Sequence, residues 1–516
     1  MFQNNASSEA LTILTETFKY QNSRDLVKVC LHEDSIKVFN LKSEKLTPDK
    51  AFFMRDIAGC SVAKSPKQND KKAYLTVYMY PRIKKNSCKE SSKRKREIAV
   101  FEYSNKDTYE GNLEVVKGWS EQLMKMLSRD LLGKPFIVYI NPNSGSGKAR
   151  TLFLERIKPI WAEASIPYAV ILTKYANHAF EHVKELNLSE IRGIFVVSGD
   201  GLVYEVINGL MSREDWREAI KTPIGQLPGG SGNALSASIC YLAKEAYIGL
   251  NLENFAMHMG FLTSKYDILP MDLVAVDISA PKNQRDTVVS NRVYSFLGIE
   301  WAIVADVDYE SEKYRYLGGL RFTMGALARI LNLRTYRGCL SFLPSSGSYT
   351  PKNNNFNMIR NPKNDEQSSL NSNKTVTNTS QPRTKYLTPL NTPVPEDWVV
   401  IDDRFVLVLV VHKPLIAKDF IAWADCKLEN NEMLLIFIKA GISKMQLMKI
   451  FLDSETGAYL THDLVESVRV KAFRIEPHEE NSYMMVDGEN VPYGPIQGEI
   501  LEPMLNCIGK RIESYE

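Results

Sequence analysis

Residues 198–201 read SGDG, and the aspartate of this turn is the side chain best placed to do chemistry. Asp200 stands between two glycines, so neither neighbour screens its carboxylate. A carboxylate beside a phosphate site is typically a magnesium ligand or a general base for an attacking hydroxyl. An ordinary Asx-turn is the structural alternative. Glu205, in the helix expected next, could orient a metal-bound water or complement the helix dipole.

Two further glycine-rich turns, NPNSGSG at 141–147 and PGGSGN at 228–233, also follow short apolar runs typical of strands. Three such turns at strand carboxyl ends would form one rim of backbone N–H groups, which favours phosphate binding over three unrelated tight turns. The first turn is not a Walker A motif, because Pro142 replaces the opening glycine and Ala149 replaces the final hydroxyl. No GxGxxG follows a strand, which makes a dinucleotide cofactor less favoured.

The elements that must hold these turns alternate between strand and helix from residue 134 to 268. This order predicts an α/β lobe that binds ligands at the carboxyl ends of parallel strands. Residues 269–516 are β-rich with few helices and predict a second lobe of antiparallel sheet. Within that lobe, residues 345–387 are rich in Asn, Ser and Thr and nearly free of aliphatic side chains, so we expect a disordered insertion.

Residues 1–130 form a separate predicted unit. Four short β-rich runs precede one amphipathic helical segment that carries Trp119, an order that resembles a pleckstrin-homology domain. The basic run KRKR at 93–96 has two interpretations, contact with anionic lipid or a solvated loop.

Composition narrows the class of protein. The chain has 516 residues, 44% hydrophobic and 24% charged, which suits about three globular domains. A net charge of +3 is too small to indicate nucleic-acid binding. Seven scattered cysteines without a CxxC pair favour a reduced compartment over a disulfide framework or a zinc site. Neither a signal peptide nor an apolar run of about 20 residues is visible, so we expect a cytoplasmic protein that touches membranes only peripherally.

Longer stretches resemble one enzyme family. SGDGLVYEVINGL at 198–210 and LPGGSGNALSASI at 227–239 are similar to sphingosine kinases, within the diacylglycerol kinase catalytic superfamily. The similarity continues through WAIVADVDYESEKYR at 301–315, LRTYRG at 333–338 and VDGE at 486–489. It covers residues 134–345 and 388–505. The ADVDxESEKYR element separates sphingosine kinases from the diacylglycerol and ceramide enzymes.

The resemblance implies a Rossmann-like nucleotide lobe followed by an antiparallel β-sandwich lobe, with ATP and Mg²⁺ in the cleft. It implies that Asp200 is the catalytic base and that Asp308 binds the sphingosine head group, where a carboxylate suits an ammonium group. Ser198 and Gly201 are the other substrate positions, and no metal ligand is assigned. The nucleotide positions are Asn141, Ser198, Gly199, Glu205, Gly230, Ser231, Gly232, Arg315, Arg321, Asp487, Gly488 and Glu489.

The chain departs from the family at three positions. Asn143 and Ala176 stand where basic residues are common, so phosphate contacts from those side chains are not expected. Gly298 replaces a hydroxyl side chain that would help to hold the head group, which leaves Asp308 with less support.

Structural alternatives exist for the charged candidates. Asp308 could form a salt bridge within the protein, and Arg315 and Arg321 could lie on a solvated helix face. Residues 321–338, which begin at Arg321 and end at Gly338, read as a basic amphipathic helix; such helices bind calmodulin or pack on their own lobe.

The sequence therefore predicts an ATP-dependent kinase of the primary hydroxyl of sphingosine and related sphingoid bases. The alternatives are a kinase of ceramide or diacylglycerol, a catalytically silent lipid- or calmodulin-binding scaffold, and a kinase of soluble substrates such as NAD kinase.

Overall fold

The computed structural model describes residues 12–20, 25–43, 47–65, 67, 70–83, 93–128, 133–279, 291–352, 358–360, 381–480 and 482–511. Contacts divide the chain into two compact units. The first comprises Met1–Pro135, Leu154–Tyr168 and Glu253–Tyr266; the second comprises Phe136–Phe153, Ala169–Leu252 and Asp267–Glu516.

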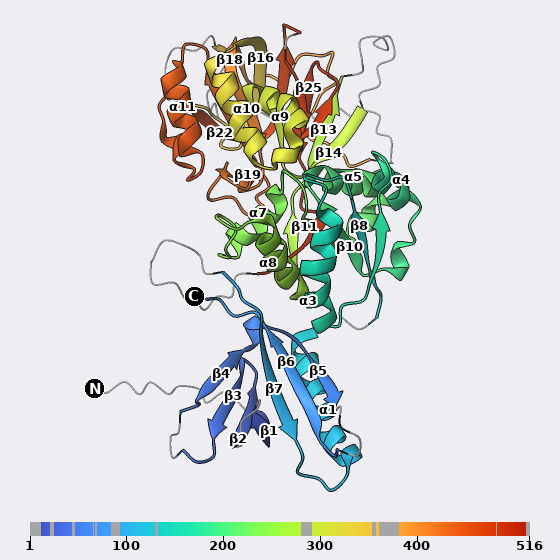
Figure 1. The fold of residues 1–516 in the computed structure, drawn as a ribbon. Helices are drawn as coiled ribbons and strands as arrows, with labels where there is room; N and C mark the ends of the chain where they lie inside the picture. Colours follow the sequence, from blue (N-terminus) through green and yellow to red (C-terminus); the bar gives the residue numbers. More distant parts are fainter. Residues whose placement is uncertain are drawn as a thin grey trace, which may run out of the picture. The chain divides into compact units, whose positions relative to one another are not determined.

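The first unit is built around an antiparallel sheet of seven strands in the order β4-β3-β2-β1-β7-β6-β5, shown in blue in Figure 1. Helix α1 packs on the sheet with Trp119, whose ring meets that of Phe18 edge-on at 5.4 Å. The elements are β1 (Thr12–Tyr20), β2 (Leu26–His32), β3 (Ser35–Asn40), β4 (Lys50–Phe53), β5 (Ile57–Lys64), β6 (Ala73–Met79), β7 (Glu97–Tyr103) and α1 (Tyr109–Ser128). Two later helices, α3 (Lys158–Glu163) and α8 (Leu252–Ser264, from its second residue onward), also belong to this unit.

Two arginines of the basic run at 93–96 are part of this fold. Arg94 is 3% exposed, and its guanidinium donates to Asp56 at 2.7 Å and to the carbonyl of Tyr80 at 2.6 Å. Arg96 donates to Glu163 on α3 at 2.6 Å. Both guanidinium groups are therefore paired within the fold, although Arg96 is exposed like Lys93 and Lys95.

In the second unit, a six-stranded sheet has the order β12-β26-β11-β10-β8-β9. Strands β8, β10, β11 and β26 run parallel, while β12 is antiparallel to β26 (Figure 1). Every residue of β8, β10 and β11 is buried, as expected of a parallel sheet covered on both faces. The strands are β8 (Phe136–Ile140), β9 (Tyr168–Leu172), β10 (Gly193–Ser198), β11 (Ile224–Pro228), β12 (Asp267–Met271) and β26 (Leu505–Gly509). The helices of this part are α2 (Ala149–Leu152), α4 (His178–Glu185), α5 (Asp200–Met211), α6 (Trp216–Ala219) and α7 (Ala234–Leu242).

An antiparallel sheet of eleven strands, counted within the described residues, forms the rest of the second unit. Strand β18 pairs with β16 and β17 through residues 399–405 and with β15 and β21 through residues 405–411, so the sheet folds over an apolar core that contains Trp301, Phe405 and Phe473. The strands are β13 (Val274–Ile278), β14 (Asn291–Ser295), β15 (Gly298–Ala302), β16 (Tyr336–Pro344), β17 (Met358–Arg360), β18 (Val399–Val411), β21 (Met433–Lys439), β22 (Glu466–Pro477), β23 (Met484–Val486), β24 (Glu489–Val491) and β25 (Ile496–Ile500).

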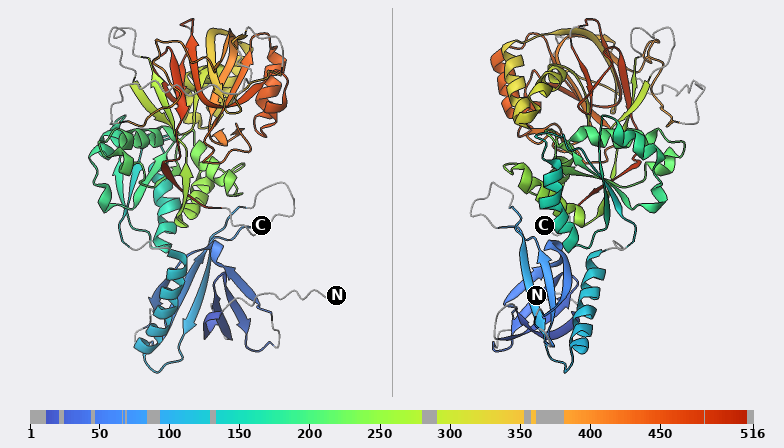
Figure 2. Two further views of the ribbon diagram at one scale, coloured as in Figure 1. Left: turned by 180° about the vertical axis from the view of Figure 1, so that it is seen from behind. Right: turned by 45° about the vertical axis from the view of Figure 1, so that its right-hand side comes forward.

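Three helices and a small hairpin pack on one side of this sheet (Figures 1 and 2). They are α9 (Ile303–Ser311), α10 (Leu320–Leu331), α11 (Lys444–Asp453), β19 (Leu415–Ala417) and β20 (Phe420–Ile421). A second apolar cluster, which includes Ile330, Leu409 and Ile450, joins them to the sheet.

The predicted succession of an α/β segment and an antiparallel β segment is confirmed. Most of the predicted insertion, residues 353–357 and 361–380, lies outside the described residues. Its two ends are well anchored: Ser345 N donates to the carbonyl of Arg469, and Lys385 N donates to Glu499 at 2.7 Å. Across the described residues, the helices are too short or too polar for any of them to cross a membrane.

Candidate active site

The three glycine-rich turns meet at the carboxyl ends of β8, β10 and β11. Ser144 Oγ accepts hydrogen bonds from Ser198 Oγ at 2.9 Å and from Gly199 N at 3.2 Å. A Cβ on Gly230 would lie 2.3 Å from Gly199 N, and one on Gly145 would lie 3.0 Å from the carbonyl carbon of Gly230. These glycines allow the backbones to approach, so the structure brings together the turns that the sequence singled out.

Several amides of this rim are already used by the turns themselves. Asn233 Oδ1 accepts from Gly229 N at 3.0 Å and from Gly230 N at 3.1 Å, while Gly199 N is bound by Ser144. An incoming phosphate therefore relies on the remaining amides of the rim, and the side chains of Ser144 and Asn233 hold the rim in shape.

Asp200 begins helix α5 and points to the N-terminus of α7. Its Oδ2 accepts from Ala234 N at 2.9 Å, and its Oδ1 accepts from Leu235 N at 3.2 Å and Gln226 Nε2 at 3.1 Å. A carboxylate offers about four acceptor positions, so these three bonds from neighbouring residues leave room on Oδ2 for one more donor. Burial raises the pKa of Asp200, and the bonds from α7 and Gln226 oppose that shift.

Glu205 caps a neighbouring helix. Its Oε2 accepts from Ala179 N at 3.2 Å in the first turn of α4, whose N-cap Asn177 has φ of 66° and makes no side-chain cap of its own. Burial raises the pKa of Glu205 and the α4 amides lower it. The carboxylate thus complements the dipole of α4, which is not the helix that carries it.

Asp487 and Gly488 form the two-residue turn between β23 and β24. Both have positive φ, 54° and 81°, as a type I′ hairpin requires. The Asp487 carboxylate is 2% exposed and accepts four hydrogen bonds from one loop. The donors are Ser295 Oγ (2.6 Å), Phe296 N (2.8 Å), Leu297 N (2.9 Å) and Gly298 N (2.9 Å). Burial raises the pKa of Asp487 to about 6 despite these bonds.

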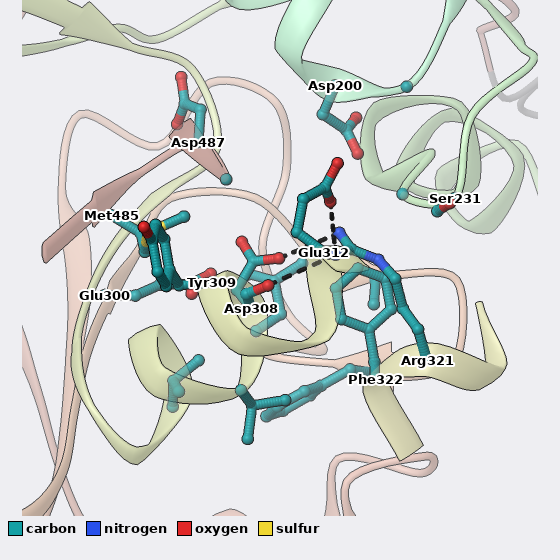
Figure 3. Close-up of a pocket in the computed structure, with 18 of the residues that line it drawn as sticks. Asp200, Ser231, Glu300, Asp308, Tyr309, Glu312, Arg321, Phe322, Met485 and Asp487 are labelled. Carbon is teal, nitrogen blue, oxygen red and sulfur yellow. Dashed lines mark hydrogen bonds and ion pairs between the residues drawn. The ribbon is translucent and has the colours of Figure 1, made fainter. Parts of the chain in front are cut away.

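Six carboxylates of the antiparallel lobe line the cavity. We call four of them the acidic wall: Glu300, Asp308, Glu312 and Glu489. Arg321 donates to Asp308 Oδ1 at 3.2 Å and pairs with Glu312 at 2.6 Å (Figure 3). The structure therefore shows the salt-bridge arrangement of Asp308, and Arg321 is buried rather than solvated. Burial raises the pKa of Asp308 to about 6, while Arg321 opposes the shift.

Glu489 and Gly201 are in contact across the cavity. A Cβ on Gly201 would lie 2.1 Å from Glu489 Oε1, so a larger residue at 201 would require this carboxylate to move. Partial withdrawal from water inside the cavity raises the pKa of Glu489 to about 7, and charge repulsion from Glu205, Asp308 and other carboxylates adds to the rise. The side chain of Arg315, the other arginine of the predicted site, is not among those that the structure describes.

All these groups border one cavity of about 810 Å³. Its polar end holds the glycine turns and the acidic wall. Its other end is apolar and is lined by α9, α10, α11, β18, β19 and β20, with Phe322, Ile330 and Ile450 among the side chains. Among the described lining residues, eight are carboxylates and two, Lys313 and Arg321, are cationic. Such a cavity suits a ligand with a cationic head and a long apolar chain.

The comparisons with known proteins agree with this chemistry. The Diacylglycerol kinase catalytic domain family matches residues 135–258. Sphingosine kinase 1 of Mus musculus is 36% identical over 377 residues, which cover 72% of this chain and 91% of the relative. The chain belongs to the sphingosine kinase family.

Two sphingosine kinase relatives of lower identity match a similar share of the chain. Sphingosine kinase 1 of Arabidopsis thaliana is 32% identical over 78% of this chain and 76% of the relative. Sphingoid long chain base kinase 4 of Schizosaccharomyces pombe is 28% identical over 70% of this chain and 72% of the relative. A crystal structure of a putative diacylglycerol kinase from Bacillus anthracis has a TM-score of 0.47 at 19% identity, covering 74% of this chain and 97% of that chain.

Sequence reasoning missed several residues of this sphingosine kinase site. Ser144, Gln226 and Asn233 hold the turns and Asp200, but short polar residues beside glycines are too common to stand out. Glu300 had a clearer signal, because it is the one charge in the apolar run FLGIEWAIVA at 296–305. A charged side chain in such a strand must face something other than the core.

Proposed function

We propose that the chain transfers the γ-phosphoryl group of ATP to the primary hydroxyl of a sphingoid base, giving sphingosine 1-phosphate from sphingosine. The observation that carries this proposal is the cavity itself. It joins a rim of glycine turns, a buried aspartate with one free acceptor position, an acid-rich wall and an apolar end in a single space. The glycine rim suits anionic phosphates, and the aspartate suits a reacting hydroxyl. The acid-rich wall suits an ammonium group, and the apolar end suits an alkyl chain.

In the proposed reaction, Asp200 accepts the proton of the primary hydroxyl at Oδ2. The hydroxyl oxygen forms a bond to the γ-phosphorus while the bond to the β,γ-bridging oxygen breaks, and ADP leaves. The α7 amides hold the aspartate in place, so catalysis requires little reorganisation of this group. Asp308 would bind the ammonium group by exchanging its bond with Arg321, which would free that arginine for phosphate.

ATP and Mg²⁺ are the cofactors we propose for this reaction. No cluster of three or more His, Cys, Asp and Glu side chains suited to a metal occurs within the described ranges. That fits Mg²⁺, which in phosphotransfer sites is commonly held by one or two carboxylates, phosphate oxygens and water. Glu489, which lines the cavity beside the rim, is the carboxylate that would hold it, and the ion would neutralise charge on the transferred phosphate.

The experiment that tests the function is a substrate panel. Radiolabelled ATP is supplied with sphingosine, sphinganine, ceramide and diacylglycerol in the same detergent, and each lipid product is separated and counted. Sphingoid bases should be turned over at the highest kcat/KM. A higher kcat/KM for ceramide or diacylglycerol would reassign the substrate class, and no product with any lipid would leave a lipid-binding scaffold as the function.

We also propose the finer fold assignments. The parallel sheet with helices supports a Rossmann-like lobe, the folded antiparallel sheet supports a β-sandwich lobe, and seven antiparallel strands followed by α1 support a pleckstrin-homology-like unit. A cytoplasmic location with peripheral membrane contact is part of the same proposal.

Helix α10 supports the membrane proposal. Its buried residues are Arg321, Ala326, Arg329 and Ile330. By contrast, Leu320, Met324 and Leu331 are 66%, 53% and 64% exposed. Cosedimentation with anionic vesicles should weaken when Met324 and Leu331 are both replaced by glutamate. Calmodulin is the competing partner for this surface, and calcium-dependent pull-down by calmodulin with no change in vesicle binding would favour it.

A further inference from the structure

We propose that Glu300 is a second head-group carboxylate, which binds the ammonium group of the sphingoid base together with Asp308. This inference rests on the proposed function, because it names a specificity-determining residue of the same cavity. Glu300 lies just before the motif at 301–315 and outside the motifs on which the family resemblance rests.

The first argument is where strand β15 places the side chain. β15 is paired on both sides, with Glu300 opposite Leu409 of β18 and Met485 of β23. Its neighbours Ile299 and Trp301 point into the apolar core and are fully buried. Because side chains alternate along a strand, Glu300 points to the other face, where it lines the cavity (Figure 3).

The second argument is the position of Glu300 between the polar and apolar ends of the cavity. Gly298, two residues earlier on the same face, is bound by Asp487 at the polar end. Two residues later, Ala302 leads into α9, whose Ile303, Val304 and Val307 line the apolar end. A strand advances about 3.3 Å per residue, so Glu300 lies roughly 7 Å beyond the Asp487 clamp, toward the apolar end. In a sphingoid base the amine is on the carbon adjacent to the one that bears the primary hydroxyl. A base whose primary hydroxyl meets Asp200 and whose chain fills the apolar end therefore places its amine near this boundary.

The third argument is the state of the carboxylate. Glu300 Oε2 is buried and has no hydrogen-bond partner among the described residues. Burial raises the pKa of Glu300 well above its ordinary value, and repulsion from Asp308 and Asp487 adds to the rise. Arg321 is occupied by Asp308 and Glu312. A buried carboxylate oxygen without a partner is costly to the free protein, and a cationic ligand is the group that would pair with it.

The test compares a charged and an uncharged lipid on matched variants. Wild type, Glu300→Gln, Glu300→Asp and the control Glu310→Gln are assayed with sphinganine and with N-acetylsphinganine at saturating ATP. Glu310 lines the same cavity but is already paired with Arg329. We expect Glu300→Gln to lower kcat/KM for sphinganine about 10-fold, the size of one charge-assisted hydrogen bond, mainly through KM. With N-acetylsphinganine, Glu300→Gln should lower kcat/KM by less than about 3-fold. Glu300→Asp should retain part of the preference for sphinganine over N-acetylsphinganine. Glu310→Gln should leave the ratio of kcat/KM for the two lipids unchanged.

Two further readouts separate the possible failures. Removing an unpaired buried carboxylate should leave Tm unchanged or higher, so a lower Tm in Glu300→Gln with equal losses on both lipids would mark Glu300 as structural and overturn the proposal. Thermal shift by octadecylamine, a plain cationic amphiphile, measures the cation site without turnover. If wild type phosphorylates no sphingoid base but octadecylamine stabilises it more than Glu300→Gln, the proposed function falls and the cation site stands. Equal stabilisation of both proteins by the amine would overturn the role of Glu300.

Discussion

Asp200 and Asp487 both follow a strand end and both line the same cavity, yet their carboxylates are used differently. Asp200 accepts three hydrogen bonds from neighbouring residues and keeps an acceptor position on Oδ2. Asp487 accepts four, three of them from consecutive backbone amides of one loop. The Asp200 carboxylate keeps room for one more donor, whereas the Asp487 carboxylate is saturated by its own chain.

The comparison shows that an aspartate in a sequence motif can be available to a ligand or can stabilise the fold. The number of acceptor positions left on its carboxylate distinguishes these two cases. On this count Asp487 fastens the β23–β24 hairpin to the loop before β15 and thereby places Glu489 against Gly201. Direct contact of Asp487 with nucleotide, which the resemblance implied, stays a prediction; the bonds of this carboxylate support an indirect role.

The largest expected effect is on turnover. Asp200→Asn removes the proposed base, and kcat should fall by roughly 10² to 10⁴. The amide also places an NH₂ group against the α7 amides or Gln226, so a loss of about 1–3 kcal/mol in unfolding free energy should accompany it. Single-turnover kinetics and thermal melts on the same sample separate the two effects. A variant with full kcat would contradict the assignment of Asp200.

The next effect is on stability. Asp487→Ala leaves four donors without their acceptor, and unfolding free energy should drop by about 3 kcal/mol or more. Glu489→Gln, two residues away, is the matched control and should leave the unfolding free energy unchanged or raise it, because it removes a carboxylate that its acidic neighbours repel. Denaturant titrations of both variants measure the contrast. Equal losses would show that the hairpin, and not the Asp487 carboxylate, carries the stability.

A smaller effect is expected from pH. Folding raises the pKa of Asp308 and Asp487 to about 6 and that of Glu489 to about 7, so the folded chain holds these protons more tightly than the unfolded chain. Their contribution to stability is present below about pH 4 and is lost as pH rises through 6 to 7. Tm without ligand should therefore fall from pH 5 to pH 8.

A double variant, Asp308→Asn with Glu489→Gln, should flatten this slope. Asp215, whose pKa is lowered mainly by its hydrogen bond with Arg213, loses its contribution at lower pH and does not cancel the trend. An unchanged slope in the double variant would place the titrating groups elsewhere.

The smallest effect concerns Glu205. In Glu205→Gln the side chain can still accept a hydrogen bond from Ala179 N but no longer places a charge at the α4 dipole. The free energy of unfolding should therefore fall by about 0.5–1 kcal/mol, while KM for ATP should change by less than about twofold. Nucleotide titrations of this variant measure the second part. A KM for ATP raised tenfold at unchanged stability would restore Glu205 to the nucleotide site.

The sequence predicted the features that depend on local order. Glycines at strand ends, alternating apolar runs and the spacing of SGDG were enough to expect the rim and the α/β segment, and the longer motifs were enough for the family. It could not predict pairings that depend on tertiary approach. Arg321 contacts Asp308 only because α9 and α10 pack together. The Asn233 side chain accepts from the amides of Gly229 and Gly230, which the glycine-rich sequence alone would assign to phosphate binding.

Strand β26 has a consequence for how the chain is made. Residues 505–509 lie between β11 and β12 in the parallel sheet, although 276 residues separate the end of β11 from the start of β26. During synthesis the first five strands of that sheet emerge early, but the interior position between β11 and β12 stays open until residues 505–509 have left the ribosome. Until then the edges of β11 and β12 that pair with β26 remain unpaired, and unpaired strand edges can form incorrect pairings. A nascent chain halted before residue 505 should therefore be more sensitive to protease than its finished counterpart, with its kinase site still unassembled.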